Sequence, residues 1–415
     1  MAFSEPANRT IAFTSLLSSA DYVRERFARR GVTLLDVVDQ QLNCPADDVD
    51  PRGILRRTVE TRDGAIGYDA GDLIPAAQAL AAAQPAFVFY GFEYDLASAD
   101  RLAALVCPDF ANDPATSLAR ERKDETDRLL RRHGYPVPRE VSFRLHEPLP
   151  ERALEAIGDS MIMKPVRYAG RHAIVSREDV DAWLHQARVA DPDPDAVYTA
   201  QELLIDWDAA GMQQTYSIDG FAIVGEYYFV SLQRWHKVVR SDGMRYCWAD
   251  QLDVGAPEHA SLLAHTREVL RVLGHQNGFF HPEFTESPSG LVLIDLNPRL
   301  AGAGGMVDRM VGIAQGVGVI DTFIDVAFGK PMMVPEPRRQ VRLLAIYGLD
   351  SGDVPTVASL SSVREIFGSK MMGCHFILFA HDDLAQVRAD SDLCYQRFVA
   401  PRYGTKTGGP SAPRP

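Results

Sequence analysis

The stretch HPEFTESPSGLVLIDLNPRL, residues 281–300, predicts a β-hairpin that carries two acids on one face. We place a three-residue loop at residues 288–290, because the glycine at its end supplies the left-handed conformation that such hairpins need. Side chains alternate between the two faces of a strand, so this loop puts Glu283 directly opposite Asp295. Opposed side chains have Cβ atoms roughly 5 Å apart, and like charges at that distance destabilise a sheet. We therefore expect a positive charge between the two acids.

The same alternation adds Asn297 to the polar face of the hairpin, opposite His281, while Ile294 and Leu296 point the other way, toward a core. Carboxylate and amide oxygens are ligands that Mg²⁺ prefers, usually together with substrate phosphates and water. The alternative is that the acids are only solvated hairpin residues. His281 could touch phosphate or metal, or it could be a hydrogen-bonded structural histidine.

A candidate anion site follows the hairpin directly. Arg299 lies two residues after Asn297, and Pro298 between them restricts the backbone of both itself and Asn297. The glycine-rich AGAGG at residues 301–305 introduces a helix whose backbone N–H groups can bind an anion. A cation site beside an anion site favours phosphate chemistry over the solvated alternative.

Length and composition limit the class of protein. The 415 residues predict two or three domains, and 46% hydrophobic with 24% charged residues is typical of a soluble globular chain. The net charge of −13 argues against a general nucleic-acid binder, although local lysines and arginines can still bind an anionic ligand.

Cysteine usage and the N-terminus predict a cytoplasmic protein. The five cysteines are scattered, form no CxxC pair and are odd in number, so a disulfide framework is not expected. The short apolar run TIAFTSLL near the N-terminus is neither a convincing signal peptide nor long enough to span a bilayer. We therefore expect no membrane partner.

The order of predicted elements describes a mixed α/β and α+β chain. Residues 10–38 predict strand, helix and strand of a small parallel sheet buried on both faces, with no GxGxxG to suggest a dinucleotide site. The charged helical segment 117–133 precedes a glycine and two prolines and predicts a domain junction. Further along, the pattern predicts strands over 160–230 interrupted by a helix at 177–189, an amphipathic helix at 259–274, and a helix near 306–328.

Five segments, in this order, resemble the ATP-grasp superfamily, and within it the L-amino-acid ligases of the bacilysin-synthesising type. The resemblance extends over roughly residues 85–330 and rests most strongly on the last segment, which contains the hairpin. The segments are VFYGFEYDLASADRLAALV (88–106), NDPATSLARERKDETDRLLRRHGYPVP (112–138), MIMKPVRYAGRHAIV (161–175), YTAQELLIDWDAAGMQQTYSIDG (198–220) and VLRVLGHQNGFFHPEFTESPSGLVLIDLNPRLAG (269–302).

The resemblance implies an ATP-grasp fold with a Rossmann-like N-terminal domain, a small lid, a central core and a C-terminal subdomain. The expected boundaries are an N-terminal α/β domain at 1–112, a connecting helix and linker at 113–150, a lid at 151–208, a core with the metal site at 209–335, a C-terminal subdomain at 336–403 and a disordered tail at 404–415.

The resemblance also assigns an ATP site. Lys123 and Lys164 would contact ATP phosphates, main-chain groups of Glu202 and Leu203 would bind adenine, and Asp208 would bind ribose. Taken alone, Lys123 could be one charge among many on a solvated helix. A lysine that ends an apolar strand before a proline, as Lys164 does, is not a usual surface pattern.

The remaining roles concern the metal and the chemistry. Glu283, Asp295 and Asn297 match the Mg²⁺ ligands, with Mn²⁺ as a substitute, so that ions bridging ATP phosphates would hold the two acids together. Arg299 matches the arginine that steadies the transferred phosphoryl group, and with Lys164 it is the expected catalytic residue.

Two departures from the family pattern stand near the ATP site. The lid loop, often Gly-Ser-x-Gly in the family, reads Gly170-Arg171-His172-Ala173. Arg171 could replace backbone contacts with a side-chain contact to phosphate, or the lid could close differently, or the site could be impaired. The family usually has glycine two residues before its ribose acid, which is more often Glu, whereas this chain has Asp206-Trp207-Asp208.

The resemblance implies ATP-dependent ligation of a carboxylic acid to an amine, with amino acids as both substrates and a homodimer as the expected assembly. Two alternatives stay open. One is an ATP-grasp enzyme with another nucleophile, such as bicarbonate in a carboxylating enzyme, and the other is a nucleotide-binding protein that has lost catalysis. The sequence identifies neither substrate, because specificity pockets are assembled from loops of several domains.

Overall fold

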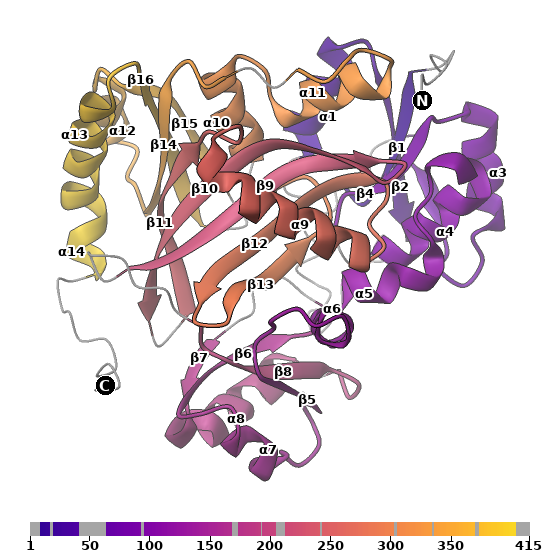
Figure 1. Cartoon of the computed structure of the whole chain (residues 1–415), viewed down its shortest axis with the longest axis horizontal. Coiled ribbons are helices and arrows are strands. Elements are labelled where there is room, and N and C mark those ends of the chain that lie inside the picture. Colours follow the sequence, from indigo (N-terminus) through magenta and orange to yellow (C-terminus); the bar gives the residue numbers. More distant parts are fainter. Residues whose placement is uncertain are drawn as a thin grey trace.

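Three β-sheets organise the chain in the computed structural model (Figure 1). The structure describes residues 9–16, 20–40, 64–92, 95–167, 173–191, 193–204, 212–240, 243–302, 305–333, 336–369 and 373–403. The candidate residues Gly170, Arg171 and Asp208, as well as the tail at 404–415, lie outside the described residues.

The N-terminal sheet is parallel and has the strand order β3-β2-β1-β4. Its apolar runs are covered on both faces, as the sequence predicts: α1 packs on one face and α3 and α4 on the other. The elements are β1 (Thr10–Thr14), α1 (Ala20–Arg29), β2 (Thr33–Asp39), β3 (Ile66–Tyr68), α3 (Ile74–Ala83), β4 (Phe87–Tyr90) and α4 (Leu96–Val106).

The lid is a separate four-stranded antiparallel sheet of order β5-β8-β6-β7, which lies below the rest of the chain in Figure 1. Its apolar face packs against two short helices. The sheet takes in β5, inside the segment expected to be linker. The elements are β5 (Glu140–Arg144), α7 (Glu151–Glu155), β6 (Ser160–Pro165), β7 (Ala173–Ser176), α8 (Val180–Ala190) and β8 (Val197–Glu202).

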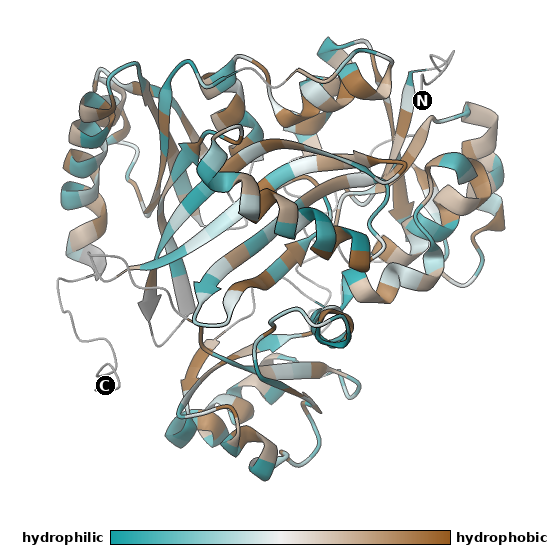
Figure 2. Cartoon of the chain, viewed as in Figure 1, coloured by the Kyte–Doolittle hydropathy of each residue, from teal (hydrophilic) through white to brown (hydrophobic). Residues whose placement is uncertain are grey.

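An eight-stranded sheet of order β13-β12-β9-β10-β11-β14-β16-β15 joins the core to the C-terminal strands without a break. The helices that cover it, such as α9 and α13, pack apolar side chains against it, and both show a mixture of apolar and polar residues in Figure 2. The elements are β9 (Gln213–Ile223), β10 (Glu226–Arg240), β11 (Gly243–Leu252), α9 (Ala260–Val272), β12 (Gly278–Ser287), β13 (Gly290–Asn297), α10 (Met306–Gln315), α11 (Val319–Ala327), β14 (Gln340–Tyr347), α12 (Val354–Ala358), β15 (Val363–Ser369), β16 (Cys374–His381), α13 (Leu384–Cys394) and α14 (Ala400–Tyr403).

The hairpin β12–β13 confirms the predicted opposition of Glu283 to Asp295, but the predicted loop is wrong by one residue. Ser287 pairs with Gly290, so the turn holds only two residues instead of three. A β-bulge at Ile294, which has no partner between the paired residues on either side, compensates for the shorter turn. The shorter turn and the bulge shift the pairing by one residue in opposite directions, so Glu283 still lies opposite Asp295.

The bulge also changes the surroundings of Ile294. Leu296 packs in the core beneath α9, as expected, whereas Ile294 is only half-buried. The backbone carbonyl of Ile294 instead accepts a hydrogen bond from Lys164 Nζ on the lid, at 3.3 Å. The expectation that Ile294 points into the core is therefore wrong.

Two segments predicted as single helices are each broken. The charged segment at 117–133 forms α5 (Ser117–Glu121) and α6 (Lys123–Arg132), because Arg122 between them is extended, with φ −108° and ψ 124°. The segment near 306–328 forms α10 and α11, and Gly316 ends α10 with φ +88°. The first break matters for the site, because it places Lys123 at the first position of α6.

One aromatic core connects the N-terminal sheet to the central sheet. The rings of Phe13 on β1 and Phe89 on β4 lie 6.4 and 5.7 Å from the ring of Phe279 on β12. Phe323 on α11 packs against Phe89 and Phe279, with ring centroids 5.6 and 4.7 Å away. Burial of such rings contributes stability by area and by edge-to-face contact, so the N-terminal domain is fixed against the core.

We expect Gly220→Ala on β9 to lower the free energy of unfolding by about 3 kcal/mol, because overpacking a closed core forces backbone shifts. A Cβ at Gly220 would lie 2.0 Å from the carbonyl oxygen of Tyr228. Urea unfolding measures the change. Gly312→Ala is the control, since a Cβ there meets nothing within 4 Å and Ala favours the helix. An unchanged midpoint for Gly220→Ala would contradict the close pairing of β9 with β10.

No single helix among the described residues is long and apolar enough to cross a membrane. In the part of the chain that the structure describes, α10 and α11 reach the necessary length and composition only as a pair, and they are bent by 81° relative to each other.

Candidate active site

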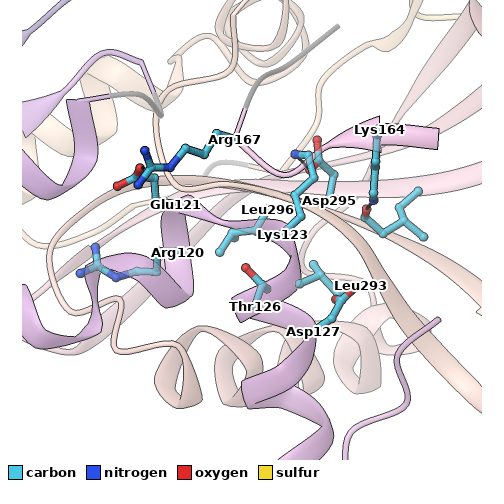
Figure 3. A pocket seen from close by; sticks show the side chains of 11 residues that line it. Arg120, Glu121, Lys123, Thr126, Asp127, Lys164, Arg167, Leu293, Asp295 and Leu296 are labelled. Carbon is cyan, nitrogen blue, oxygen red and sulfur yellow. Dashed lines mark hydrogen bonds and ion pairs between the residues drawn. The ribbon is translucent and has the colours of Figure 1, made fainter. Parts of the chain in front are cut away.

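A pocket opens where the start of α6, the end of lid strand β6 and hairpin strand β13 meet (Figure 3). The space between its side chains measures about 460 Å³ and includes open solvent. The lining residues are Arg120, Glu121, Lys123, Thr126, Asp127, Lys164, Arg167, Leu293, Ile294, Asp295 and Leu296. The pocket therefore brings together three predicted site residues, Lys123, Lys164 and Asp295, from segments distant in the sequence.

The positive charge expected between the hairpin acids is supplied in this structure by two lysines. Lys123 Nζ donates to Asp295 Oδ1 at 2.5 Å, and Lys237 Nζ on β10 donates to Glu283 Oε2 at 2.6 Å. Each carboxylate thus has its own ammonium partner, which relieves their mutual repulsion. Asn297 stays on the same face and donates to Asp295 Oδ2 at 3.4 Å.

Lys123 is held at the entrance of the pocket by its backbone as well as its side chain. The break at Arg122 turns the chain, and the Lys123 N–H then donates to the carbonyl of Val166, just beyond β6, at 3.1 Å. This hydrogen bond ties the start of α6 to the lid. It brings Lys123 next to the strand that carries the second predicted lysine.

Lys164 is buried on β6 with its ammonium at the hairpin. Burial and the neighbouring charge of Lys123 lower its pKa, against the opposing effect of Asp295. The carboxyl of Asp295 shows the complementary shift. Its burial would raise the pKa, but Lys123 and Lys164 outweigh that effect and hold it below the usual value. Asp295 is consequently ionised at neutral pH.

Glu283 belongs to a buried charge network on the central sheet. His281 Nδ1 lies 2.8 Å from Asp219 Oδ1, and its Nε2 lies 3.7 Å from Glu283 Oε1. Burial would lower the pKa of His281, but Asp219 and Glu283 raise it to about 10. Burial would raise the pKa of Glu283, but Lys237 and His281 hold it well below its usual range. The network keeps Glu283 anionic, and it accounts for His281 as a hydrogen-bonded histidine.

Arg299 lies against the predicted metal ligand next to it in the chain. Its Nη2 donates to Asn297 Oδ1 at 3.1 Å, and its Nη1 donates to the carbonyl of Leu300 at 3.0 Å. Arg299 as a whole is half-buried. These contacts orient the planar group at the end of β13, close to the hairpin acids.

The predicted hinge residues lie at the end of lid strand β8. Glu202 holds Arg139 with both carboxylate oxygens: Oε1 accepts from its backbone N–H at 2.8 Å, and Oε2 accepts from its Nε at 2.6 Å. The Glu202 side chain thus has a structural partner, while half-buried Leu203 follows it. The pocket does not include either residue.

Three functional-site neighbours were missed from the sequence: Asp219, Lys237 and Tyr246. They come from β9, β10 and β11: Lys237 and Tyr246 contact Glu283, and Asp219 contacts His281, only because of the strand order of the sheet. Lys237 gave no signal like that of Lys164, because the stretch QRWHKVVR at residues 233–240 is rich in polar and basic residues. Its ammonium lies 4.7 Å from the centre of the Tyr246 ring.

The donors fit a hard cation. Two ionised carboxylates and an amide oxygen source lie on one face of the hairpin, and oxygen donors of this kind suit Mg²⁺. Among the described residues, no three His, Cys, Asp and Glu side chains approach one another closely enough to hold a metal. A cation held by these hairpin side chains would therefore need further oxygen ligands, such as those of a phosphate.

The three sheets and their helices match the ATP-grasp fold, so the predicted fold class is confirmed. An L-amino acid ligase from Bacillus licheniformis superposes on 94% of this chain and 98% of its own, with a TM-score of 0.68 and 15% identity. A carboxyaminoimidazole ribonucleotide synthase from Aspergillus clavatus, complexed with ATP, covers 94% and 99%, with a TM-score of 0.64 and 14% identity. At these identities the likeness establishes the fold.

The sequence itself matches one curated protein at 28% identity over 170 residues: dapdiamide A synthase of Enterobacter agglomerans. The match covers 37% of this chain and 37% of that synthase, so it spans little more than a third of the curated relative. No protein-family model matches the chain.

Proposed function

We propose that this chain is an ATP-dependent carboxylate–amine ligase that joins two amino acids through an acyl phosphate. The observation that carries the proposal is the meeting of Lys123, Lys164 and Asp295 in one pocket, beside Arg299. The names of two similar proteins, an L-amino acid ligase and dapdiamide A synthase, support amide formation and a role in the biosynthesis of small peptides. A cytoplasmic location would suit a supply of ATP and free amino acids.

ATP would bind with its phosphates between the two lysines. In the structure, Lys123 already has Asp295 as its counter-ion, while buried Lys164 contacts only a carbonyl among the bonds described for it. A phosphate chain brings negative charge to both ammonium groups, which offsets their mutual repulsion. Main-chain groups at Glu202 and Leu203 would bind adenine, and Gly170, Arg171 and Asp208 would complete the site from segments outside the described residues.

Glu283, Asp295 and Asn297 would hold Mg²⁺ together with phosphate oxygens. When bound, the metal supplies positive charge that offsets the charge of the transferring phosphoryl group. For Asp295 to coordinate it, Lys123 must move from the carboxylate to the phosphates. The exposed fraction of the Asp295 side chain, 30%, leaves room for this exchange.

The reaction would then proceed in two steps. A carboxylate oxygen of the first amino acid attacks the γ-phosphorus of ATP, and the bond from that phosphorus to the ADP oxygen breaks. Lys123, Lys164 and Arg299 stabilise the charge that spreads over the phosphoryl oxygens. The amine of the second amino acid attacks the carbonyl carbon and loses a proton, and phosphate leaves. The lid would exclude water that could hydrolyse the acyl phosphate.

A second candidate is a ligase that activates bicarbonate. It is favoured by the similarity to carboxyaminoimidazole ribonucleotide synthases, whose TM-scores of 0.61–0.64 approach that of the L-amino acid ligase. Both candidates share the lysines, the metal site and an acyl phosphate type of intermediate, so the site geometry alone does not separate them. Substrate dependence does.

The test is phosphate release from ATP and Mg²⁺ with pairs of amino acids, with bicarbonate and with neither. Our proposal predicts turnover that requires two amino acids and a product of their combined mass less water. Turnover with bicarbonate alone would support the second candidate. If no pair of the proteinogenic amino acids stimulates phosphate release, while ATP still binds, the ligase proposal is contradicted.

We expect Lys164→Ala to weaken the binding of a non-hydrolysable ATP analogue at least tenfold, and Glu202→Gln to weaken it much less. The lysine meets phosphate charge, whereas the Glu202 side chain binds Arg139 and its hinge contact uses the backbone. Calorimetric titration of both variants and the wild type measures the difference. Equal affinity of Lys164→Ala and the wild type for the analogue would show that β6 does not contribute to the phosphate site.

A further inference from the structure

The lid sheet has a polar face as well as an apolar one. Met161 and Met163 on β6 and Ala200 on β8 belong to the apolar core of the lid. The alternate residues point to the opposite face, which is turned toward α6 and the pocket. There the register places Glu140 beside Gln201, and Thr199 beside Lys164.

Two carboxyl groups that the mechanism does not use meet on this polar face. Asp127 on α6 is 5% exposed, and the side chain of Glu140 on β5 is 7% exposed. The two carboxyl groups interact directly, and burial raises the pKa of both, so we expect the pair to share one proton near neutral pH. Gln201 Nε2 also donates to Asp127 Oδ2 at 2.8 Å, and Thr199 Oγ1 donates to Glu140 Oε2 at 3.4 Å.

The cations around Asp127 and Glu140 are Arg131, Lys123 and Lys164. With one shared proton, the pair has one negative charge that can balance the charge of Lys164. Arg131 on α6 is the nearest guanidinium, 3.9 Å from Glu140, but half of its side chain is exposed. Lys164 on β6 and Lys123 at the start of α6 are the other cations that act on the pair. Burial and the charge of Asp127 raise the pKa of Glu140 to about 8, because two adjacent carboxylates cannot both ionise cheaply.

We propose that Asp127 and Glu140 act as a one-proton positioning pair for Lys164, which keeps that lysine charged and available to the ATP phosphates at neutral pH. The inference rests on the proposed function in one respect, that Lys164 contacts phosphate. With one proton the pair carries a single negative charge, enough to stabilise the buried ammonium. With no proton it carries two, which would draw the Lys164 ammonium toward the pair and repel the phosphates.

The direction of the pH dependence follows from this charge change. The pair keeps its proton below about pH 8 and loses it above, so ATP affinity should be highest at pH 7 and fall at higher pH. If binding requires the proton, the dissociation constant rises about tenfold between pH 7 and pH 9, by linkage of one proton to one ligand. Glu140→Gln places a permanently neutral hydrogen-bond donor at the same position and should abolish most of that rise.

The experiment is calorimetric titration of the full chain with a non-hydrolysable ATP analogue and Mg²⁺ at intervals from pH 6.5 to 9.5. We compare the wild type, Glu140→Gln and the control Glu155→Gln, which removes an exposed acid from the same lid. The proposal predicts a tenfold rise in the wild type and in the control, and less than a threefold rise in Glu140→Gln. A purely structural role would change melting temperature without changing the pH profile.

A second measurement does not depend on ATP. Infrared difference spectra of the ligand-free protein should show a protonated carboxyl at pH 7 that is lost on raising the pH to 9.5, and that is missing in Glu140→Gln. If Glu140→Gln keeps the wild-type pH dependence of ATP binding, titration of Lys164 itself explains it and the proposal is overturned. If the analogue binds at no pH to any variant, the proposed function fails, and the infrared result then decides the protonation of the pair alone.

Discussion

We expect Arg299→Lys to slow amide formation by about a hundredfold or more, equivalent to about 2.7 kcal/mol of transition-state stabilisation, while ATP binds nearly as tightly as before. The guanidinium is held by Asn297 Oδ1 and by the carbonyl of Leu300. A planar group fixed in this way can bind a phosphoryl group with two parallel hydrogen bonds, which an ammonium cannot reproduce. The loss should therefore appear in the chemical step.

Parallel assays of nucleotide affinity and of product formation with the best amino-acid pair measure this effect. Arg271→Lys is the matched control, because Arg271 is exposed on α9 and pairs only with Glu268 among the contacts described for it. We expect the control to ligate at the wild-type rate. If Arg299→Lys does so as well, Arg299 is not catalytic and the mechanism loses its contact with the acyl phosphate.

Asp295→Asn should lower turnover by about a hundredfold at limiting Mg²⁺ while leaving the fold intact. Neutralising the acid removes a metal ligand and the counter-ion of Lys123, but the site is partly solvated, so the lysine can rehydrate. Turnover measured against Mg²⁺ concentration should show weaker metal activation. Unimpaired turnover at limiting Mg²⁺ would count decisively against the metal assignment.

The matched control for this substitution is Glu286→Gln, an exposed acid on the same hairpin, which should leave metal activation unchanged. Glu283→Gln is less suitable as a probe. It leaves Lys237 without its carboxylate in a buried network, and removing one partner of a buried ion pair costs about 3 kcal/mol or more. A lower melting temperature in Glu283→Gln, but not in Asp295→Asn, would agree with this difference in burial.

The hairpin shows how far local pattern can predict structure. Period-two alternation placed Glu283 opposite Asp295 correctly, although the turn is one residue shorter than predicted. The bulge at Ile294 compensates, and nothing in the local pattern indicates it. Alternation is dictated by backbone geometry, whereas a bulge is selected by packing of the whole sheet.

Contacts between strands far apart in the sequence were beyond prediction from pattern. Lys237 on β10 reaches Glu283 on β12 across β9, which lies between the two strands in the sheet. That strand order cannot be read from either segment. Asp127 lies in the charged segment 117–133 and Glu140 in the predicted linker, and nothing in the local pattern singles out either acid. They are buried together only because the lid folds onto α6. Lys164 was found because a lysine ending an apolar strand is unusual wherever it folds.

The most direct test of the central claim is the transfer of a labelled oxygen. The chain is supplied with ATP, Mg²⁺, an amine substrate and a first amino acid whose carboxylate carries ¹⁸O, and the released phosphate is analysed by mass spectrometry. Attack of the carboxylate on the γ-phosphorus predicts that each phosphate carries one ¹⁸O from the amino acid. Phosphate released at the same rate without the label would show that water or another nucleophile attacks ATP, and would contradict an acyl phosphate.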